Sequence, residues 1–173
     1  MLVSATKGRF PKNRLVEFMN SMASERKFFL LTIDEVLSGE ILFFVENNGR
    51  ILGIGGIRFL PGILVQFFKL PVEFIVVLEE FQGHSIGRQI RTALDEDSTE
   101  RYSYLVVTIF KDNEKALNLY KNSRFRYLGA TKDRVFLLRP SNFVGLIIYY
   151  LLKIALWFLL PIRSFFERER LST

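Results

Sequence analysis

The fold of this chain is decided by residues 74–90, FIVVLEEFQGHSIGRQI, where an apolar run meets a turn that contains glycine. The run at 74–78 is too apolar for a half-exposed strand, which predicts a central strand. Ile86, Ile90 and Leu94 then recur every fourth residue and predict an amphipathic helix. The polar turn between a buried strand and a helix raises the question of what it is for.

This turn has the features of an anion site. A strand-to-helix turn leaves several backbone N–H groups unpaired, and the helix dipole adds to their attraction for an anion such as a pyrophosphate. Gly83 and Gly87 remove side chains where a phosphate must approach the backbone, and Gln82 and Arg88 add donors. A purely structural turn also uses glycines, so both interpretations stay open on this stretch alone. It matches neither the P-loop nor the G-x-G-x-x-G pattern.

The rest of the chain predicts an α/β domain. The expected elements are a helix at 11–24, a hairpin at 41–59 around Asn47-Asn48-Gly49, a strand at 104–110, a helix from 112 or 113 to 120, and two closing strands at 125–129 and 135–138. Residues 63–68 are expected to form either a further short strand or part of a loop. The chain is therefore expected to form one domain over residues 1–140. Residues 141–173 are expected to add an apolar C-terminal helix and a charged tail.

Composition excludes several kinds of site. The chain has 173 residues, no cysteine and a single histidine, so disulfides, thiolate chemistry and multi-histidine metal sites are ruled out, and no metal is predicted. The net charge of +6 suits nucleic acid, an anionic membrane surface or an anionic cofactor. Because the Lys and Arg residues are scattered and no nucleic-acid motif stands out, no nucleic-acid partner is predicted.

A second motif lies downstream, in residues 105–129, LVVTIFKDNEKALNLYKNSRFRYLG. Together with residues 82–87 it resembles the GNAT superfamily of N-acetyltransferases. That family's loop reads Gln/Arg-x-x-Gly-x-Gly/Ala after a strand, and this chain fits it at Gln82 and Gly87. The downstream residues that match the family's signature are Asn113, Ala116, Leu119-Tyr120 and Phe125. The resemblance covers about residues 41–138.

Two positions depart from the family pattern. Ser85 replaces the first loop glycine, and a serine fits there as long as the position does not need a positive φ. Arg124 replaces the glycine before Phe125, and an arginine with φ above zero would be strained. Both departures keep a poorly catalytic relative among the alternatives.

The resemblance implies a fold and a cofactor. The fold is α/β (α+β), with a mixed, mainly antiparallel central sheet, helices on both faces, and a splayed parallel strand pair at 74–78 and 104–110. Acetyl-CoA is the implied co-substrate, with its pantetheine arm along the backbone of the first splayed strand and its pyrophosphate at the turn. The implied cofactor-binding residues are Val76, Leu78, Gln82, Gly83, His84, Ser85, Ile86, Gly87, Arg88, Asn113, Ala116 and Tyr120.

The resemblance also implies an acid and leaves the base open. Tyr120 is expected to protonate the leaving thiolate, against the alternative of a core aromatic side chain. Glu73 is the first candidate for the base that deprotonates the amine, followed by Glu79 and Glu80. The alternative for all three glutamates is a solvated strand end. His84 is expected to contact phosphate or solvent, and Asn113 to bind the pantetheine arm, cap a helix, or do both.

These features predict an N-acetyltransferase that moves the acetyl group of acetyl-CoA directly to a primary amine. The alternatives are a non-catalytic acyl-CoA-binding module and transfer of a longer acyl chain, which the Phe-rich residues 63–74 and the apolar tail would suit. The acceptor amine is not readable from the sequence.

The C-terminal segment, residues 143–160, is apolar except for Lys153 and has three interpretations. It is a membrane tail anchor, an interfacial helix near Arg163, Arg168 and Arg170, or a helix packed on the core or on a second subunit as in a homodimer. The chain is expected in the cytoplasm. The first two interpretations place it at the cytosolic face of a membrane.

Overall fold

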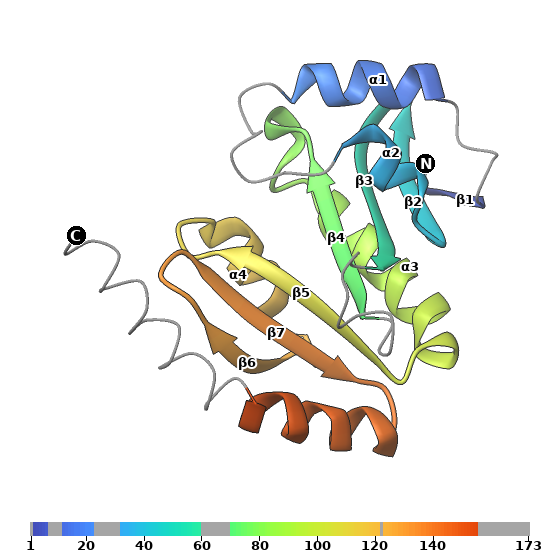
Figure 1. The fold of residues 1–173 in the computed structure, drawn as a ribbon. Coiled ribbons are helices and arrows are strands. Elements are labelled where there is room, and N and C mark those ends of the chain that lie inside the picture. The colour runs from blue at the N-terminus through green and yellow to red at the C-terminus, as the bar shows by residue number, and fades with distance from the viewer. Residues whose placement is uncertain (1, 7–11, 23–31, 60–69, 122, 156–173) are drawn as a thin grey trace, which may run out of the picture. The chain divides into compact units, whose positions relative to one another are not determined.

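The structure is a computed structural model, and it describes residues 2–6, 12–22, 32–59, 70–121 and 123–155 (Figure 1). The chain divides into two compact units, Met1–Tyr102 and Ser103–Thr173. The turn predicted as an anion site lies in the first unit, and the downstream motif lies in the second.

The first unit contains four consecutive strands that pair in chain order, each antiparallel to the next. They are β1 (Leu2–Thr6), β2 (Ile41–Asn47), β3 (Arg50–Phe59) and β4 (Pro71–Val77). The predicted hairpin is confirmed, because Asn48 (φ 47°) and Gly49 (φ 80°) form the left-handed two-residue turn that joins β2 to β3. β1 was not predicted.

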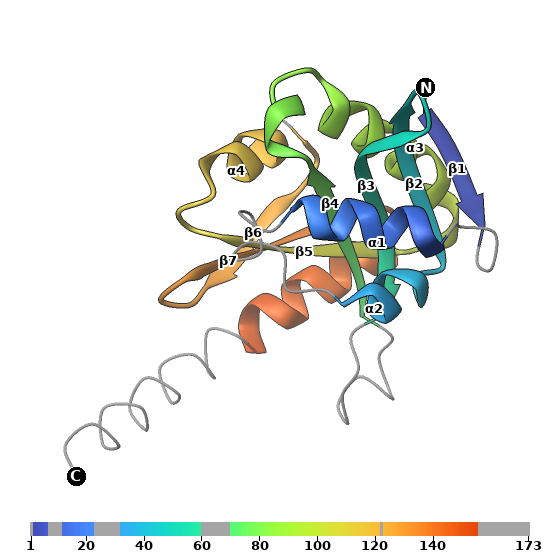
Figure 2. The ribbon, with the colours of Figure 1, turned by 90° about the horizontal axis from the view of Figure 1, so that it is seen from above.

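Helices cover both faces of this sheet, as Figure 2 shows, with α1 and α2 on one side and α3 on the other. The helices are α1 (Lys12–Ser21), α2 (Ile33–Leu37), the single 3-10 turn η2 (Glu79–Phe81) and α3 (Ile86–Arg101). The predicted helix at 11–24 is confirmed over α1, whose Leu15 and Phe18 are buried against the sheet. Phe74 and Val76 of β4 belong to the same core cluster.

On the opposite face, α3 lies very close to β3. A Cβ atom added at Gly55 would stand 2.4 Å from Cγ2 of Ile90 and 3.1 Å from the carbonyl oxygen of Phe74. Ile86, Ile90 and Leu94 are all buried, as their spacing predicted. Glycine at position 55 thus lets α3 approach the sheet closely.

The short helix α2 is held by a capping box. The Thr32 hydroxyl accepts a hydrogen bond from the Glu35 N–H at 3.2 Å, and the Thr32 N–H donates to the Glu35 carboxylate at 2.8 Å. Arg58 of β3 donates to the same carboxylate at 2.8 Å. The Thr32 N–H, with Arg58 adding to it, holds the pKa of Glu35 below its ordinary value of 4.5.

The second unit contains the elements β5 (Tyr104–Phe110), α4 (Glu114–Lys121), β6 (Arg126–Ala130) and β7 (Arg134–Pro140). β7 lies between β5 and β6 and is antiparallel to both. The predicted strand at 104–110 and both closing strands are therefore confirmed. β7 thus pairs with β5, the first strand of this unit, as well as with β6, its partner in the hairpin.

A helix over residues 143–155 follows β7. It carries large apolar side chains that are exposed, among them Phe143 and Leu151. Within the described stretches, the helices are too short or too polar to cross a membrane. Residues 156–160 of the predicted apolar segment, and residues 63–68 of the Phe-rich stretch, lie outside the described residues. The predicted boundary between residues 140 and 141 stays a prediction.

Candidate functional site

The chain leaves β4 through a turn in which several residues donate hydrogen bonds to the backbone before them. The Leu78 N–H donates to the Leu52 carbonyl at 2.9 Å, and the Leu78 carbonyl accepts from the Phe81 N–H at 2.9 Å. The Gln82 amide folds back and donates to the Val77 carbonyl at 3.2 Å. Gly83 has a φ of 87°, which allows the chain to turn toward α3.

Ser85 is the N-cap residue of α3 and has left-handed backbone angles, φ 63° and ψ 7°. Its side chain makes no capping hydrogen bond to the helix. The loop position does need a positive φ, so the condition under which a serine would fit without strain is not met. A left-handed conformation costs a residue with a side chain about 1–2 kcal/mol. Ser85, which immediately precedes the first residue of α3, therefore carries this conformational strain.

The start of α3 is suited to an anion. The N–H groups of Ile86, Gly87 and Arg88 belong to the first turn, where a helix offers no internal carbonyl partner. The first turn carries no acidic residue, and Arg88 is exposed. Since the helix dipole places partial positive charge at this end, an external anion would satisfy both the N–H groups and the dipole.

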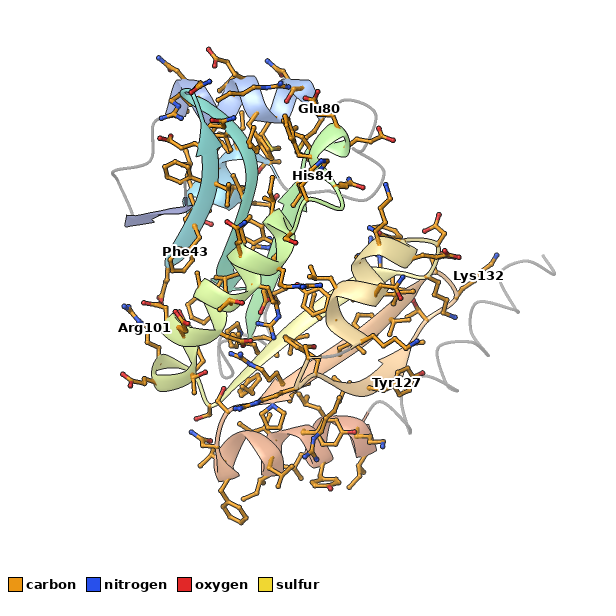
Figure 3. The ribbon with its side chains drawn as sticks, turned by 180° about the vertical axis from the view of Figure 1, so that it is seen from behind. Phe43, Glu80, His84, Arg101, Tyr127 and Lys132 are labelled. Carbon is orange, nitrogen blue, oxygen red and sulfur yellow. The ribbon has the colours of Figure 1, made fainter. Side chains whose placement is uncertain are left out.

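Three polar side chains of the turn are exposed to solvent. Glu80 and His84, labelled in Figure 3, are exposed, and so is Glu79. Glu80 forms an ion pair with Arg50 at 2.5 Å between two side chains that are each more than half exposed. Exposed pairs of this kind contribute little to stability. The interpretation of Glu79 and Glu80 as solvated residues at the strand end fits their exposure.

Glu73 does not fit that interpretation, because its side chain is completely buried. It lies on the face of β4 that packs against α3, where its carboxylate is 3.4 Å from Nε of Arg91, which is itself buried. A second carboxylate, that of Asp95, lies 2.7 Å from the same guanidinium. Glu73 is thus buried in an ion pair with Arg91, which the partly exposed Asp95 also contacts, and is not a solvated strand end.

Sequence reasoning missed Arg91 and Asp95. A signal for Arg91 was present, since it follows Ile90 directly on the apolar side of the predicted helix, where a cation needs an acidic partner. Glu73 stands in the otherwise apolar strand PVEFIVV. An isolated acid in a buried strand and an isolated base on the helix that follows it predict a buried ion pair.

In the second unit, the downstream motif forms the start and the inner face of α4. The side-chain oxygen of Asn113 accepts the Ala116 N–H at 3.0 Å, so the predicted helix cap is confirmed. Tyr120 is buried, and its ring packs edge-on against Phe125 with 5.1 Å between ring centroids. Arg124 is free of backbone strain, because among the described residues only Asn48 and Ser85 combine a side chain with a positive φ.

The predicted site residues therefore fall into two sets. Val76, Leu78 and the turn residues 82–88 gather at the end of β4 and the start of α3 in the first unit. Asn113, Ala116 and Tyr120 gather on α4 in the second unit. Glu73 lies on β4 beneath α3, with its carboxylate turned toward Arg91.

Several solved structures that resemble this chain are named as acetyltransferases or putative acetyltransferases. An acetyltransferase of the GNAT family from Streptococcus pneumoniae matches with a TM-score of 0.62 at 20% identity, over 81% of this chain and 99% of that one. YncA from Salmonella typhimurium, solved with its cofactor acetyl-CoA, matches with a TM-score of 0.63 at 14% identity, over 82% of this chain and 95% of that one. A ribosomal-protein-alanine N-acetyltransferase from Brucella melitensis gives a TM-score of 0.57 at 16% identity, with coverages of 81% and 99%.

At these identities the likeness shows the fold alone, and it confirms the predicted GNAT-like mixed sheet with helices on both faces. A comparison with curated protein sequences gives no match. The family model of the Acetyltransferase (GNAT) family matches residues 11–125, which is more than half of the chain and includes the turn and the downstream motif as far as Phe125. With the turn, the helix start and the α4 motif all within that match, the chain belongs to the GNAT acetyltransferase family.

Proposed function

We propose that this chain transfers the acetyl group of acetyl-CoA directly to a primary amine. Members of the family use acetyl-CoA, and the YncA structure contains it. The observation that carries the proposal is the start of α3, where Ser85 leaves the first-turn N–H groups without a side-chain cap. A pyrophosphate placed there would take up these donors and meet the positive end of the helix dipole.

The remaining predicted residues have roles along the same cofactor. The pantetheine arm would run along the backbone of Val76 and Leu78. Because the Leu78 N–H already donates to Leu52, the hydrogen bonds to the arm fall mainly to other backbone groups of β4. The Asn113 side-chain oxygen is engaged with Ala116, so its amide nitrogen is the group offered to the arm.

In the reaction, the amine nitrogen attacks the acetyl carbonyl carbon, the carbon–sulfur bond breaks, and the coenzyme A thiolate leaves. We assign Tyr120 as the acid that gives its phenolic proton to that thiolate. The attacking amine must lose one proton, and Glu73 is the proposed acceptor, with Glu79 and Glu80 as the alternatives. Glu73 is buried beside Arg91, so it could also serve only as a structural ion pair. A structural role and a role as the base predict different results for a Glu73 variant.

The first experiment is a thermal melt of the full chain with and without acetyl-CoA. A ligand at a hundred times its dissociation constant adds about 2.7 kcal/mol to the free energy of unfolding, so a clear rise in Tm is expected. Gly87→Glu should abolish the rise, because it places a carboxylate among the helix N–H groups. The same change should leave the unliganded protein as stable as before, since an acidic residue suits a helix N-terminus.

Gly87→Gln is the matched control for size without charge, and it should keep part of the rise in Tm. If acetyl-CoA at millimolar concentration gives no shift with the unmodified chain, the cofactor part of the proposal is wrong. A larger shift with long-chain acyl-CoA than with acetyl-CoA would instead favour the longer acyl donor.

Turnover tests the acid and the base. Tyr120→Phe keeps the ring against Phe125, so we expect cofactor binding to persist while kcat falls by 10² to 10⁴, the usual contribution of general acid catalysis. Loss of turnover with binding retained also rejects the alternative of a non-catalytic binding module, whereas unchanged turnover removes Tyr120 from the mechanism.

Glu73→Gln should lower kcat/KM and remove the acidic limb from the plot of kcat/KM against pH. A loss of folding stability with an unchanged pH profile would leave Glu73 as a structural residue. Glu79→Gln and Glu80→Gln then test the two alternative bases in the same way.

A further inference from the structure

The helix over residues 143–155 has one face that is docked on its own unit. Gly145 meets the start of β5 so closely that an added Cβ atom would stand 1.8 Å from the carbonyl oxygen of Ser103. Tyr149 is buried, and its hydroxyl donates to the Tyr127 carbonyl at 3.0 Å. These contacts fix which side of the helix faces the protein.

The opposite side is apolar and exposed. Its side chains, with their exposed fractions, are Phe143 75%, Val144 54%, Ile147 44%, Tyr150 53%, Leu151 62% and Ile154 55%. They recur at spacings of three and four, so they form one continuous stripe. A helix docked by one face normally presents polar side chains on the other, and exposed apolar stripes of this size mark interaction sites.

Cationic groups border this stripe. Lys153 is the only charged residue of the described helix, and its ammonium lies 3.4 Å from the Tyr149 hydroxyl. The exposed Arg126 of β6 places its guanidinium 5.9 Å from the centre of the Tyr149 ring. Tyr127, 55% exposed, is the neighbour of Arg126 along β6. The surface thus combines exposed apolar and aromatic side chains with a basic margin.

The net charge of the whole second unit is positive, like the residues that border the stripe. Residues 103–173 contain 12 Lys and Arg against 5 Asp and Glu, a net charge of +7, while residues 1–102 contain 12 against 13, a net charge of −1. In the sequence, the apolar run continues to Leu160, and Arg163, Arg168 and Arg170 follow. The unit that carries the apolar stripe therefore also carries all of the excess positive charge.

We propose that helix 143–155 binds the surface of an anionic lipid bilayer. The stripe from Phe143 to Ile154 would lie among the acyl chains, with Arg126 and Lys153 level with the lipid phosphates, as in interfacial helices that are apolar on one side and basic at the margin. A second copy of the chain is the less suitable occupant, because it would bring two units of net charge +7 together. None of the residues of this surface is among those assigned to acetyl transfer.

The test is co-sedimentation of the full chain with vesicles of phosphatidylcholine alone and of phosphatidylcholine mixed with phosphatidylserine. Binding is expected to the mixed vesicles, and it should weaken as salt is added. The double variant Ile147→Glu with Leu151→Glu should lose binding. The matched control, Thr92→Glu with Asn118→Glu, makes the same change in net charge at exposed helix positions and should keep most of it.

Arg126→Gln tests the basic margin, and we expect it to lower the affinity for mixed vesicles about fivefold. All variants should keep the Tm and the acetyl-CoA response of the unmodified chain, since each change is at an exposed position. Equal binding of the Ile147→Glu, Leu151→Glu variant and its control would overturn the proposal. So would a lack of binding together with a dimer that this variant dissociates, which would assign the stripe to a second copy.

Discussion

At the scale of single residues, the left-handed backbone of Ser85, a residue of the proposed site, lowers the stability of the folded chain. Replacing Ser85 with glycine should stabilise the unliganded chain by about 0.5 kcal/mol, because the relief of left-handed strain exceeds the entropy that glycine adds to the unfolded chain. Ser85→Val should destabilise it by about 1 kcal/mol or more, since a β-branched residue tolerates this conformation poorly. Urea unfolding of both variants measures the effect.

Ser38 provides the control for Ser85. It also lies at a helix end, but its φ is −75°, so Ser38→Gly offers no strain to relieve and should not stabilise the chain. A Ser85→Gly variant less stable than the unmodified protein would show that the left-handed turn is not strained.

The buried pair of Glu73 and Arg91 gives a second prediction at this scale. Arg91→Met should destabilise the chain by about 3–5 kcal/mol, because it leaves the Glu73 carboxylate buried without its cation. The double variant Glu73→Leu with Arg91→Met should recover most of that loss, since a buried ion pair replaced by apolar side chains is often close to neutral. Chemical denaturation of the single and double variants measures the coupling.

Arg101→Met is the matched control on the same helix. Arg101 pairs with Asp97 at 3.0 Å, but its side chain is 61% exposed, so its removal should cost no more than about 0.5 kcal/mol. If Arg91→Met and Arg101→Met cost the same, Glu73 does not depend on Arg91.

The sequence predicts contacts between neighbouring residues more reliably than contacts between residues far apart in the chain. The cap formed by Asn113 was predicted, because a cap needs only a local geometry that the sequence signals. The left-handed angle of Ser85 was posed as a condition, but it depends on how closely α3 is drawn onto β3. The burial of Glu73 depends on an arginine 18 positions later, which local patterns do not connect to it.

At the scale of elements, the capping box of α2 makes stability depend on pH. Because the folded-state pKa of Glu35 is lowered, its contribution is fully present above the ordinary value of 4.5 and is lost as the pH falls through the lowered pKa. Thr32→Ala removes the side-chain half of the box and should cost about 1 kcal/mol at neutral pH. Part of the difference from the unmodified chain should disappear in acid, because the Thr32 side chain also helps to lower the pKa of Glu35 and that contribution ends when Glu35 is protonated.

Urea unfolding of both proteins at neutral and acidic pH checks this prediction. Asp34→Asn is the control, since it removes a carboxylate from the same first turn without touching the box. A difference that stays constant over the whole pH range would exclude Glu35 as its source.

Elements with a strong repeating pattern were predicted, and short ones were missed. The period of Ile86, Ile90 and Leu94 and the Asn-Gly turn of the hairpin each span enough residues to be recognised. α2 and β1 are five residues each, too short for a period to show. Both are held by partners distant in the sequence, β1 by β2 and α2 partly by Arg58.

At the scale of the whole molecule, the sequence pointed to the family through two motifs about thirty residues apart, and the family match covers the first motif and the second as far as Phe125. The total charge of +6 left three kinds of partner open. Charges that are scattered along the chain became informative only when the two compact units were known, because the excess then falls to residues 103–173. The direction in which helix 143–155 faces is set by Gly145 and Tyr149, contacts that periodicity alone does not contain.

The pairing of β7 with β5 has a consequence for synthesis. The strands of the first unit pair in chain order, so each can join the sheet soon after it leaves the ribosome. One edge of β5 instead pairs with β7, which is made only after α4 and β6. Until then the apolar strand YLVVTIF exposes an unpaired edge, the kind of intermediate that aggregates or recruits chaperones. We therefore expect the nascent chain to be most vulnerable between the completion of β5 and the completion of β7.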